Sequence, residues 1–365
     1  THFTNHALGI ISVKAMEKMA LYHYEIWSND FGQLVLVTAA FTHVGLALWR
    51  TAKRSTLKIP FWEFTQLVLG LYIPWTLAPH VAATLGLMNV HGVIPSYHQM
   101  LTILWPEGAL MQSILLLVVW SHAMIGLHFW LRMYPFYRRL LPLLSALALA
   151  FPVLALWGWI EGARRLAAEG KYKLKVTDAQ VDWVYTAADQ VRGVVFGLII
   201  LSLAVILFRM VVRRFGSRIT IQYPGDLKVR TAPGPTLLEL SRMNGIPHTA
   251  VCGGRARCST CRVRVIEGQD NLPPPGSAEE AVLNRIEAGE DVRLACQIKP
   301  GSDICVRPLV PAKSATGGLQ QVLADAYHWG VEQDVVIMFV DLRNFTKITE
   351  TNLSYDVVFL LNRYL

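Results

Sequence analysis

Long apolar segments constrain this chain more than any other feature of its sequence. A helix needs about 20 apolar residues to cross a bilayer, and five segments reach or exceed that length: 31–50, 63–88, 107–131, 139–160 and 191–212. Only 16% of the residues are charged and 53% are hydrophobic, whereas a soluble domain has about 25% charged residues. The apolar excess lies before residue 213. We therefore expect an all-α transmembrane helical bundle over residues 1–215, followed by soluble domains.

The distribution of lysine and arginine predicts the orientation of these spans. Basic residues cluster after the first, third and fifth spans, over 50–58, 132–139 and 209–218. Because such clusters favour the cytoplasmic side, we expect the soluble domains in the cytoplasm and the bundle in the membrane, in contact with lipid. The segment 89–106 has no lysine or arginine, as expected of an outer loop. The segment 161–190 disagrees, because it carries five basic residues, offset by five acidic ones.

The beginning of the chain predicts a further span. The sequence starts with Thr1 rather than methionine, and the segment 8–27 contains two lysines and two glutamates. That segment resembles an interfacial helix. We expect His2 to lie at the outer end of a span that is mostly missing, which would give six spans in the natural chain.

Four cysteines predict a metal cluster in the soluble part. Cys252, Cys258 and Cys261 lie within ten residues, and Cys296 follows after a gap of thirty-four. Zinc sites also use four cysteines, but usually as two close pairs, whereas a tight trio with a distant fourth is typical of a 2Fe–2S cluster. Glycines 253 and 254 permit the backbone angles of a loop that wraps around sulfur atoms. The fifth cysteine, Cys305, lies in an apolar run and is expected to be a small core residue.

Residues 218–310 resemble a ferredoxin of the adrenodoxin-like branch, because five residues separate the first two cysteines. This resemblance implies an α+β ferredoxin-like β-grasp domain, which we place at residues 216–310.

Histidines within the predicted spans are the second chemical signal, since ionisable residues at membrane depth are rare and usually functional. At 1.5 Å per residue, His80 lies about 26 Å from the cytoplasmic side, level with His2 and His6. His43 and His122 or His128 lie nearer the cytoplasmic ends. Facing histidines in a helical bundle hold bis-histidine haem, so we expect His80 with His2 or His6 in an outer layer and His43 with His122 or His128 in an inner one.

The alternative is that each histidine is a hydrogen-bonded core residue. Two more histidines, His91 and His98, lie in the outer loop, and we expect them to be solvated or to border a quinone site.

The membrane part also resembles a known family. The motifs are Asn5-His6-Ala7-Leu8-Gly9, Leu77-Ala78-Pro79-His80 and Gly126-Leu127-His128-Phe129-Trp130-Leu131-Arg132. They are similar to the membrane anchor of a group of bacterial class III adenylate cyclases, which is related to the dihaem cytochrome b subunit of succinate dehydrogenases and fumarate reductases. The resemblance implies two b haems, contact with quinone or quinol, and a position in the inner membrane of a bacterium.

The last part of the chain resembles a different enzyme family. Residues 311–330 form a linker by composition, with a short helical pattern that is suited to transmit a change. Residues 331–365 then predict a buried strand ending at Asp341 and a helix over 354–365. The stretch 339–346 resembles the opening of an α+β class III nucleotide cyclase domain, in which the aspartate matching Asp341 is catalytic and binds Mg²⁺.

Two functional hypotheses follow. The first is a homodimeric redox sensor in signal transduction, in which quinone-linked haems and a 2Fe–2S cluster regulate an adenylate cyclase that makes cyclic AMP from ATP. On this hypothesis residues 1–365 alone would be inactive, because the other cyclase residues would lie beyond Leu365. The alternative is an electron-transfer protein, a dihaem cytochrome b fused to a ferredoxin, without cyclase activity. The sequence has no basic–aromatic pattern of the kind that indicates nucleic-acid binding.

Overall fold

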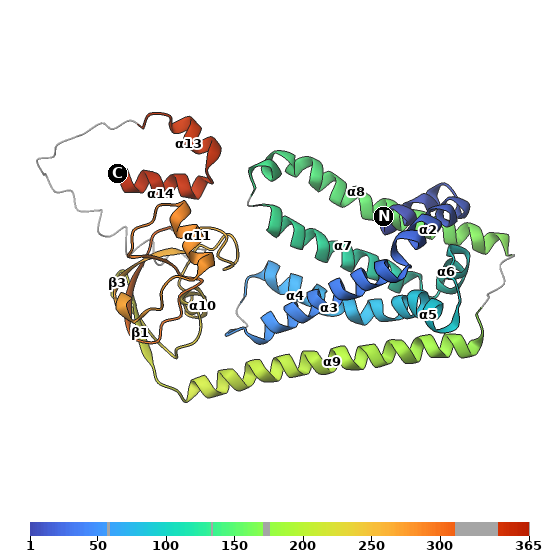
Figure 1. Cartoon of the computed structure of the whole chain (residues 1–365), viewed down its shortest axis with the longest axis horizontal. Helices are drawn as coiled ribbons and strands as arrows, with labels where there is room; N and C mark the ends of the chain where they lie inside the picture. The colour runs from blue at the N-terminus through green and yellow to red at the C-terminus, as the bar shows by residue number, and fades with distance from the viewer. Residues whose placement is uncertain (57–58, 133, 171–175, 311–341, 365) are drawn as a thin grey trace, which may run out of the picture. The chain divides into compact units, whose positions relative to one another are not determined.

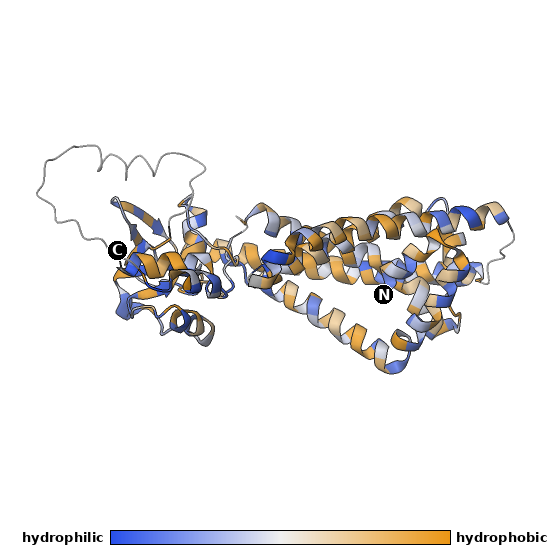
Figure 2. Cartoon of the chain, turned by 90° about the horizontal axis from the view of Figure 1, so that it is seen from above, coloured by the Kyte–Doolittle hydropathy of each residue, from blue (hydrophilic) through white to orange (hydrophobic). Residues whose placement is uncertain are grey.

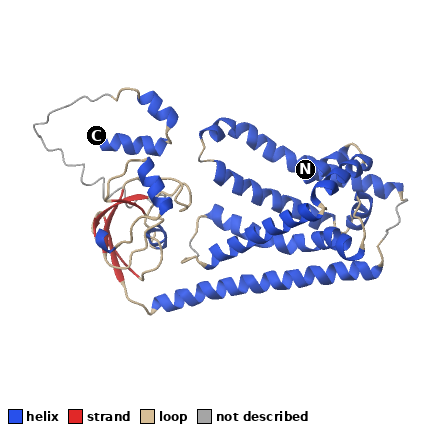
Figure 3. Cartoon of the chain, viewed as in Figure 1, coloured by secondary structure: helices blue, strands red, loops and turns tan. Residues whose placement is uncertain are grey.

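The computed structural model describes residues 1–365 except 57–58, 133, 171–175, 311–341 and 365. The chain divides into two compact units (Figure 1). One comprises Thr1–Lys53 and Pro60–Val205, and the other Arg54–Ile59 and Ile206–Leu365. The described strands all lie in the second unit (Figure 3).

The first unit is helical, as expected. Its elements are α1 (His2–Ala7), η1 (Leu8–Ile10), α2 (Val13–Trp27), α3 (Asp30–Ala52), α4 (Phe61–Val81), η2 (Ala82–Gly86), α5 (Leu87–His91), α6 (Tyr97–Leu104), α7 (Ala109–Leu131) and α8 (Pro135–Glu169). Helix α9 (Asp178–Arg214) begins in the first unit and ends in the second. Five stretches are long and apolar enough to cross a membrane: 30–52, 61–91, 109–131, 136–169 and 178–214. Hydrophobic residues predominate along these helices (Figure 2). They coincide with the five predicted spans.

The segment 161–190 differs from the predicted loop. Helix α8 continues to Glu169 and α9 begins at Asp178, so only 170–177 connect them. Arg165 pairs with Glu161 one turn earlier, at 2.9 Å, and donates to the carbonyl of Ile11 at 3.0 Å. Arg164 pairs with the same carboxylate at 3.4 Å. Both arginines therefore lie in helix α8 and pair with Glu161, rather than in a loop. This is why their charge does not follow the orientation that the basic clusters of the other segments predict.

The segment 8–27 is helical only in part. Helix α2 starts at Val13, because the Ser12 side chain accepts a hydrogen bond from the Ala15 N–H and caps it. It is tied to the segment 92–96 between α5 and α6, where the Tyr24 hydroxyl donates to the Pro95 carbonyl at 2.6 Å. Helix α1 precedes it and packs on α8, where Gly158 permits close approach: a side chain there would overlap the His6 carbonyl.

Helix α4 is irregular next to one of the predicted haem ligands. It contains Pro74 and Pro79, and the π-helical segment η2 follows directly. Each proline removes a backbone donor, and π segments are frequent at functional sites. The irregularity therefore flanks His80, whose carbonyl accepts from the Thr84 hydroxyl at 2.7 Å.

The second unit contains a five-stranded sheet with the order β2-β1-β5-β3-β4. The strands are β1 (Ile219–Tyr223), β2 (Leu227–Thr231), β3 (Arg262–Glu267), β4 (Val292–Leu294) and β5 (Ile304–Pro308). Strands β1 and β5 are parallel and the other neighbours antiparallel. The helical elements around the sheet are α10 (Leu237–Met243), η3 (Gln269–Asn271) and α11 (Ser277–Arg285). This arrangement confirms a ferredoxin-like α+β domain.

One face of the sheet forms the core of this domain. Because side chains alternate along a strand, Ile221 and Tyr223 of β1 point inward and pack with Leu237 and Leu240 of α10. The same alternation corrects the prediction for Cys305. Its neighbours in β5 are buried, whereas Cys305 points to the opposite face and is half-buried.

Two helices follow further along the chain, α13 (Phe345–Thr351) and α14 (Ser354–Tyr364). The latter confirms the predicted helix at 354–365. The predicted strand and Asp341 lie outside the described residues.

A buried ion pair joins α11 to β4. The Arg293 guanidinium donates to both carboxylate oxygens of Glu279, at 3.0 and 2.9 Å, and the Leu294 N–H donates to the same carboxylate at 2.8 Å. Replacing Glu279→Ala leaves a buried arginine unpaired, which should lower the free energy of unfolding of this domain by about 3–5 kcal/mol. Hydrogen exchange of the β3 and β4 amides in increasing urea would measure this loss in the detergent-solubilised chain.

The control is Asp291→Asn, which breaks the exposed ion pair with Arg264 (2.8 Å, side chains 45% and 50% exposed). It should cost less than about 1 kcal/mol. Equal losses in the two variants would contradict a structural role for the buried pair.

Candidate iron–sulfur site and histidine clusters

The four cysteines of the predicted cluster lie together in the second unit. Cys252, Cys258 and Cys261 belong to the loop before β3, and Cys296 follows β4. All four are free thiols and buried, with at most 6% of each residue exposed. The structure therefore brings the distant fourth cysteine to the other three, as predicted.

Backbone hydrogen bonds hold these two segments together. The Ala295 N–H donates to the Cys261 carbonyl at 3.0 Å, which places Cys296 beside the end of the cysteine loop. The Leu238 N–H of α10 donates to the Ala295 carbonyl at 2.9 Å. Helix α10 is itself fixed by a capping box between Thr236 and Glu239.

The cysteines interact as two pairs: the Cys252 N–H donates to the Cys258 Sγ at 3.4 Å, and the Cys261 thiol is the neighbour that most affects the pKa of Cys296. Among the described residues, no three histidine, cysteine or acidic side chains are grouped closely enough to hold a single metal ion. Two pairs of thiolates suit two irons, with two sulfur ligands for each. The donor set thus fits a 2Fe–2S cluster better than a zinc ion, which takes four ligands at once.

Hydrogen bonds within the loop stabilise thiolates. The Cys258 thiol, and then the backbone N–H groups of residues 255, 257 and 258, lower the pKa of Cys252 to about 4. The Cys261 thiol, followed by the Gln297 amide at 3.2 Å, lowers the pKa of Cys296. The partner thiols Cys258 and Cys261 have raised pKa values, because they share a proton with Cys252 and Cys296 and are buried. Each pair therefore favours one thiolate, and metal binding, which requires deprotonated cysteine, would displace the remaining protons.

The conformation of the loop explains its glycines. Gly253 and Gly254 have φ angles of 72° and 82°, in the left-handed region that glycine adopts without strain. A side chain at Gly254 would lie 3.5 Å from the Cys296 Cβ atom. Ala256, with φ 50°, is also left-handed, which the sequence did not indicate.

The outer histidines of the first unit form one cluster. The ring centroids of His2 and His80 are 5.8 Å apart, and those of His2 and His6 are 4.6 Å apart. His23 of α2 also contacts His2, at 5.5 Å. Sequence reasoning missed His23, because it assigned the segment 8–27 to the membrane interface rather than to this cluster.

The inner histidines separate into a pair and a single residue. The ring centroids of His43 and His122 are 6.1 Å apart, whereas His128 instead forms a hydrogen bond with the Tyr137 hydroxyl at 2.9 Å. Helices α4 and α7 approach closely here, because Gly70 has no side chain. A Cβ atom at this position would lie 2.8 Å from the His122 ring. The Gln66 amide donates to the His122 carbonyl at 3.1 Å.

These separations are compatible with haem. Two imidazoles on opposite sides of one metal ion have centroids about 6 Å apart, because each nitrogen lies about 2 Å from the metal. Both His2–His80 and His43–His122 meet this condition. The buried Nδ1 atom of His122 also has no hydrogen-bond partner in the described part of the chain.

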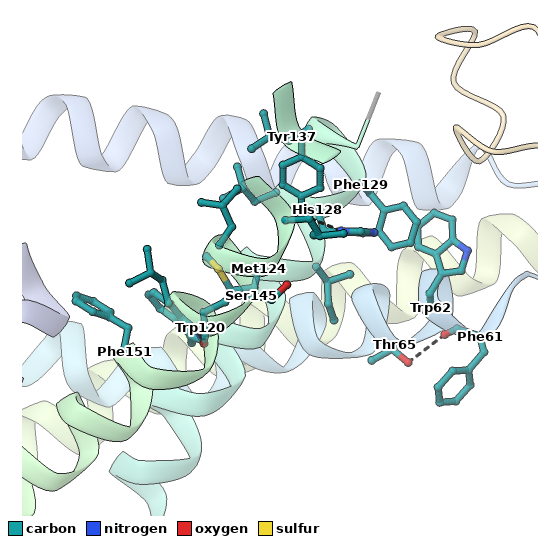
Figure 4. A pocket seen from close by; sticks show the side chains of 17 residues that line it. Phe61, Trp62, Thr65, Trp120, Met124, His128, Phe129, Tyr137, Ser145 and Phe151 are labelled. Atoms are coloured by element: carbon teal, nitrogen blue, oxygen red, sulfur yellow. Dashed lines mark hydrogen bonds between the residues drawn. The ribbon is translucent and has the colours of Figure 1, made fainter. Parts of the chain in front are cut away.

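A cavity of about 750 Å³ lies among α4, α7 and α8 (Figure 4). Its walls are almost entirely apolar and aromatic, including Trp120, Met124 and Phe151. The hydrogen-bonded pair of His128 and Tyr137 lies at one side of it. The size and composition are those of a site for an apolar ligand with a few polar groups.

Comparison with known proteins places residues 223–301 in the family of 2Fe-2S iron-sulfur cluster binding domains. One component of the Na(+)-translocating NADH-quinone reductase of Chlamydia caviae is 29% identical over 31% of this chain and 25% of its own length. Ferredoxin CarAc of a Sphingomonas species is 40% identical over 20% of this chain and 68% of its own length. The crystal structure of an ISC-like [2Fe-2S] ferredoxin from Pseudomonas putida JCM 20004 is 27% identical and covers 27% of this chain and 96% of its own, with a TM-score of 0.24.

This chain spans only about a quarter of the length of the curated reductase components that it matches.

The prediction of an adenylate cyclase is wrong. The relatives are components of a quinone reductase and a ferredoxin, which are redox proteins and not cyclases. The prediction depended on the resemblance of the membrane motifs to a cyclase anchor and on a short resemblance around Asp341, which lies outside the described residues. The helix over 354–364 packs on the ferredoxin-like domain. ATP, Mg²⁺ and cyclic AMP signalling lose their support with it. The homodimer, which depended on the same resemblance, stays a prediction.

The 40% identity to ferredoxin CarAc and the match over 223–301 thus agree with the buried cysteine pairs: through this domain the chain belongs to the 2Fe–2S ferredoxin family.

Proposed function

We propose that this chain is a membrane electron-transfer protein in which a 2Fe–2S ferredoxin domain is fused to a dihaem, quinone-reactive helical bundle. The gathering of four buried cysteines as two pairs carries this proposal. Five apolar helices support the membrane part. The basic clusters at the ends of alternate spans support a cytoplasmic position for the ferredoxin domain in a bacterial inner membrane.

The cluster ligands in this proposal are Cys252, Cys258, Cys261 and Cys296. When bound, a 2Fe–2S cluster supplies one-electron transfer. The protein contributes burial and hydrogen bonds to sulfur, such as the one from the Arg255 N–H to the Cys252 Sγ at 3.4 Å. Such bonds stabilise negative charge on the sulfurs and tune the reduction potential.

The haem ligands in this proposal are His80 with His2 on the outer side and His43 with His122 on the inner side. The ring separations favour these two pairs. His6 packs edge-on against Tyr97, at 5.8 Å, and His128 is hydrogen-bonded to Tyr137. Haem bound at these pairs supplies one-electron chemistry within the membrane.

The cavity beside His128 is the proposed quinone site. Its apolar walls suit an isoprenoid quinone, and the pair of His128 and Tyr137 supplies hydrogen-bonding groups for a carbonyl oxygen. The reductase components that this chain resembles belong to an enzyme named for its reaction with quinone, and this supports the same partner class here.

The cluster ligands can be tested with two cysteine variants. Cys258→Ser removes a buried ligand, so the purified chain should lose its cluster absorbance together with its iron and acid-labile sulfide. Cys305→Ser should retain two irons and two sulfides per chain, because Cys305 points away from the core. Stoichiometric zinc without iron in the wild-type chain would contradict the proposed cofactor.

The inner haem can be tested by comparing His122 with His128. His122→Ala should remove about half of the haem measured as the pyridine haemochrome, because the second bis-histidine pair stays intact. His128→Ala should retain both haems. A His43→Ala, His80→Ala double variant with full haem content would refute both pairs.

The quinone site can be tested at Tyr137. Tyr137→Phe removes the hydroxyl that is bonded to His128, and it should slow haem reduction by a short-chain quinol about tenfold, as the loss of one hydrogen bond predicts. The control is Tyr134→Phe, since Tyr134 is 46% exposed and does not line the cavity. Equal rates in the two variants, with haem content unchanged, would contradict this location.

A further inference from the structure

Helix α14 packs against the cysteine loop of the ferredoxin domain, within the second unit. Ser259, which follows Cys258 directly, is fully buried, and its hydroxyl donates to the Asp356 carboxylate of α14. Asp356 is only 6% exposed. A buried carboxylate is tolerated when it is hydrogen-bonded and paired, so this contact is specific.

Arg262, which follows Cys261 directly, completes the contact. Its side chain is 1% exposed and donates to the Ser259 hydroxyl at 2.9 Å on one side. On the other side it donates to the Tyr355 carbonyl of α14 at 3.1 Å. The guanidinium lies 4.2 Å from the centre of the Phe359 ring and 4.0 Å from the Asp356 carboxylate. Helix α14 thus supplies an acceptor, a charge and an aromatic face to a single arginine.

This contact covers the part of the domain that holds the metal. Ser259 and Arg262 are each adjacent in sequence to a cluster cysteine. Burial, and then proximity to Cys258, raises the pKa of the Tyr355 hydroxyl, so this side chain also lies near the loop. A second bond fixes the far end of the helix, where Arg363 donates to the Glu287 carbonyl at 2.9 Å.

We propose that α14 is an intramolecular occupant of the surface through which the ferredoxin domain exchanges electrons with another protein. With α14 seated, Ser259 and Arg262 are covered and a protein partner is excluded from the cysteine loop. With α14 released, the same surface presents a guanidinium and a hydroxyl, which suit an acidic partner that offers a carboxylate next to an aromatic ring. Release of α14 therefore controls the access of protein partners to the cluster.

The inference rests on the proposed one-electron function of the cluster, and its test separates large acceptors from small ones. In the reduced full-length chain, Asp356→Ala and Phe359→Ala should each raise the rate of electron transfer to an acidic flavodoxin about tenfold, because each removes a buried contact of Arg262. Hexaammineruthenium(III) is too small for one helix to exclude it from the cysteine loop. The rate at which it oxidises the reduced chain should therefore change less than about twofold. The matched control is Asn362→Ala, an exposed position of the same helix, which should leave both rates unchanged.

Three outcomes would overturn the inference. Unchanged flavodoxin rates, in variants whose α14 amides have become fast in hydrogen exchange, would show that the helix does not block access. Equal increases for both acceptors would show a change at the cluster instead. Fast hydrogen exchange of the α14 amides in the wild-type chain would show that the helix is not seated. This measurement does not require a bound cluster. The absence of a cluster would contradict the proposed function, separately from this inference.

Discussion

The cysteine site depends on the pairing of β3 with β4, which continues in the hydrogen bond from the Ala295 N–H to the Cys261 carbonyl. It joins the end of the cysteine loop to the segment that carries Cys296, which lies beyond a gap of thirty-four residues in the sequence. The sheet makes this connection possible, because β3 and β4 are antiparallel neighbours that run from these two segments. Closing a loop of this length costs conformational entropy, which the buried core and the ion pair between Arg293 and Glu279 offset. Four thiols are thereby gathered before any metal contributes.

In the membrane unit, glycine has a comparable role. Gly70 leaves room for the His122 ring between α4 and α7, and Gly158 lets α1 approach α8. Each glycine removes the side chain that would otherwise separate two helices, as small residues do at helix contacts in membranes. The histidine pairs are thus a consequence of helix packing as well as of depth.

The two arginines of the ferredoxin domain that are most deeply buried have different roles. Arg293 is paired within the domain by Glu279. Arg262 is paired by Asp356 and Tyr355, which belong to a helix outside the sheet and its core. The first pairing therefore stabilises the fold, while the second couples the cysteine loop to a separate element. The short sequence around Asp341 resembles that of a cyclase, but helix α14, which follows it, contacts the ferredoxin domain.

The sequence by itself indicated five apolar helices and the 2Fe–2S class of the soluble domain, and it supplied four cysteines as the proposed ligands, because apolar length and cysteine spacing are local properties of the chain. It placed the histidines at two depths, since depth follows from position along a helix. It did not distinguish His2 from His6 or His122 from His128, because this choice depends on the rotation and crossing of helices. In the structure, contacts such as that of Gly70 with His122 and the π-helical segment after His80 set the positions of these rings, and the proposed pairs rest on them. The seating of α14 on Ser259 and Arg262 likewise came only from the tertiary structure, because it joins residues about a hundred positions apart that no sequence period relates.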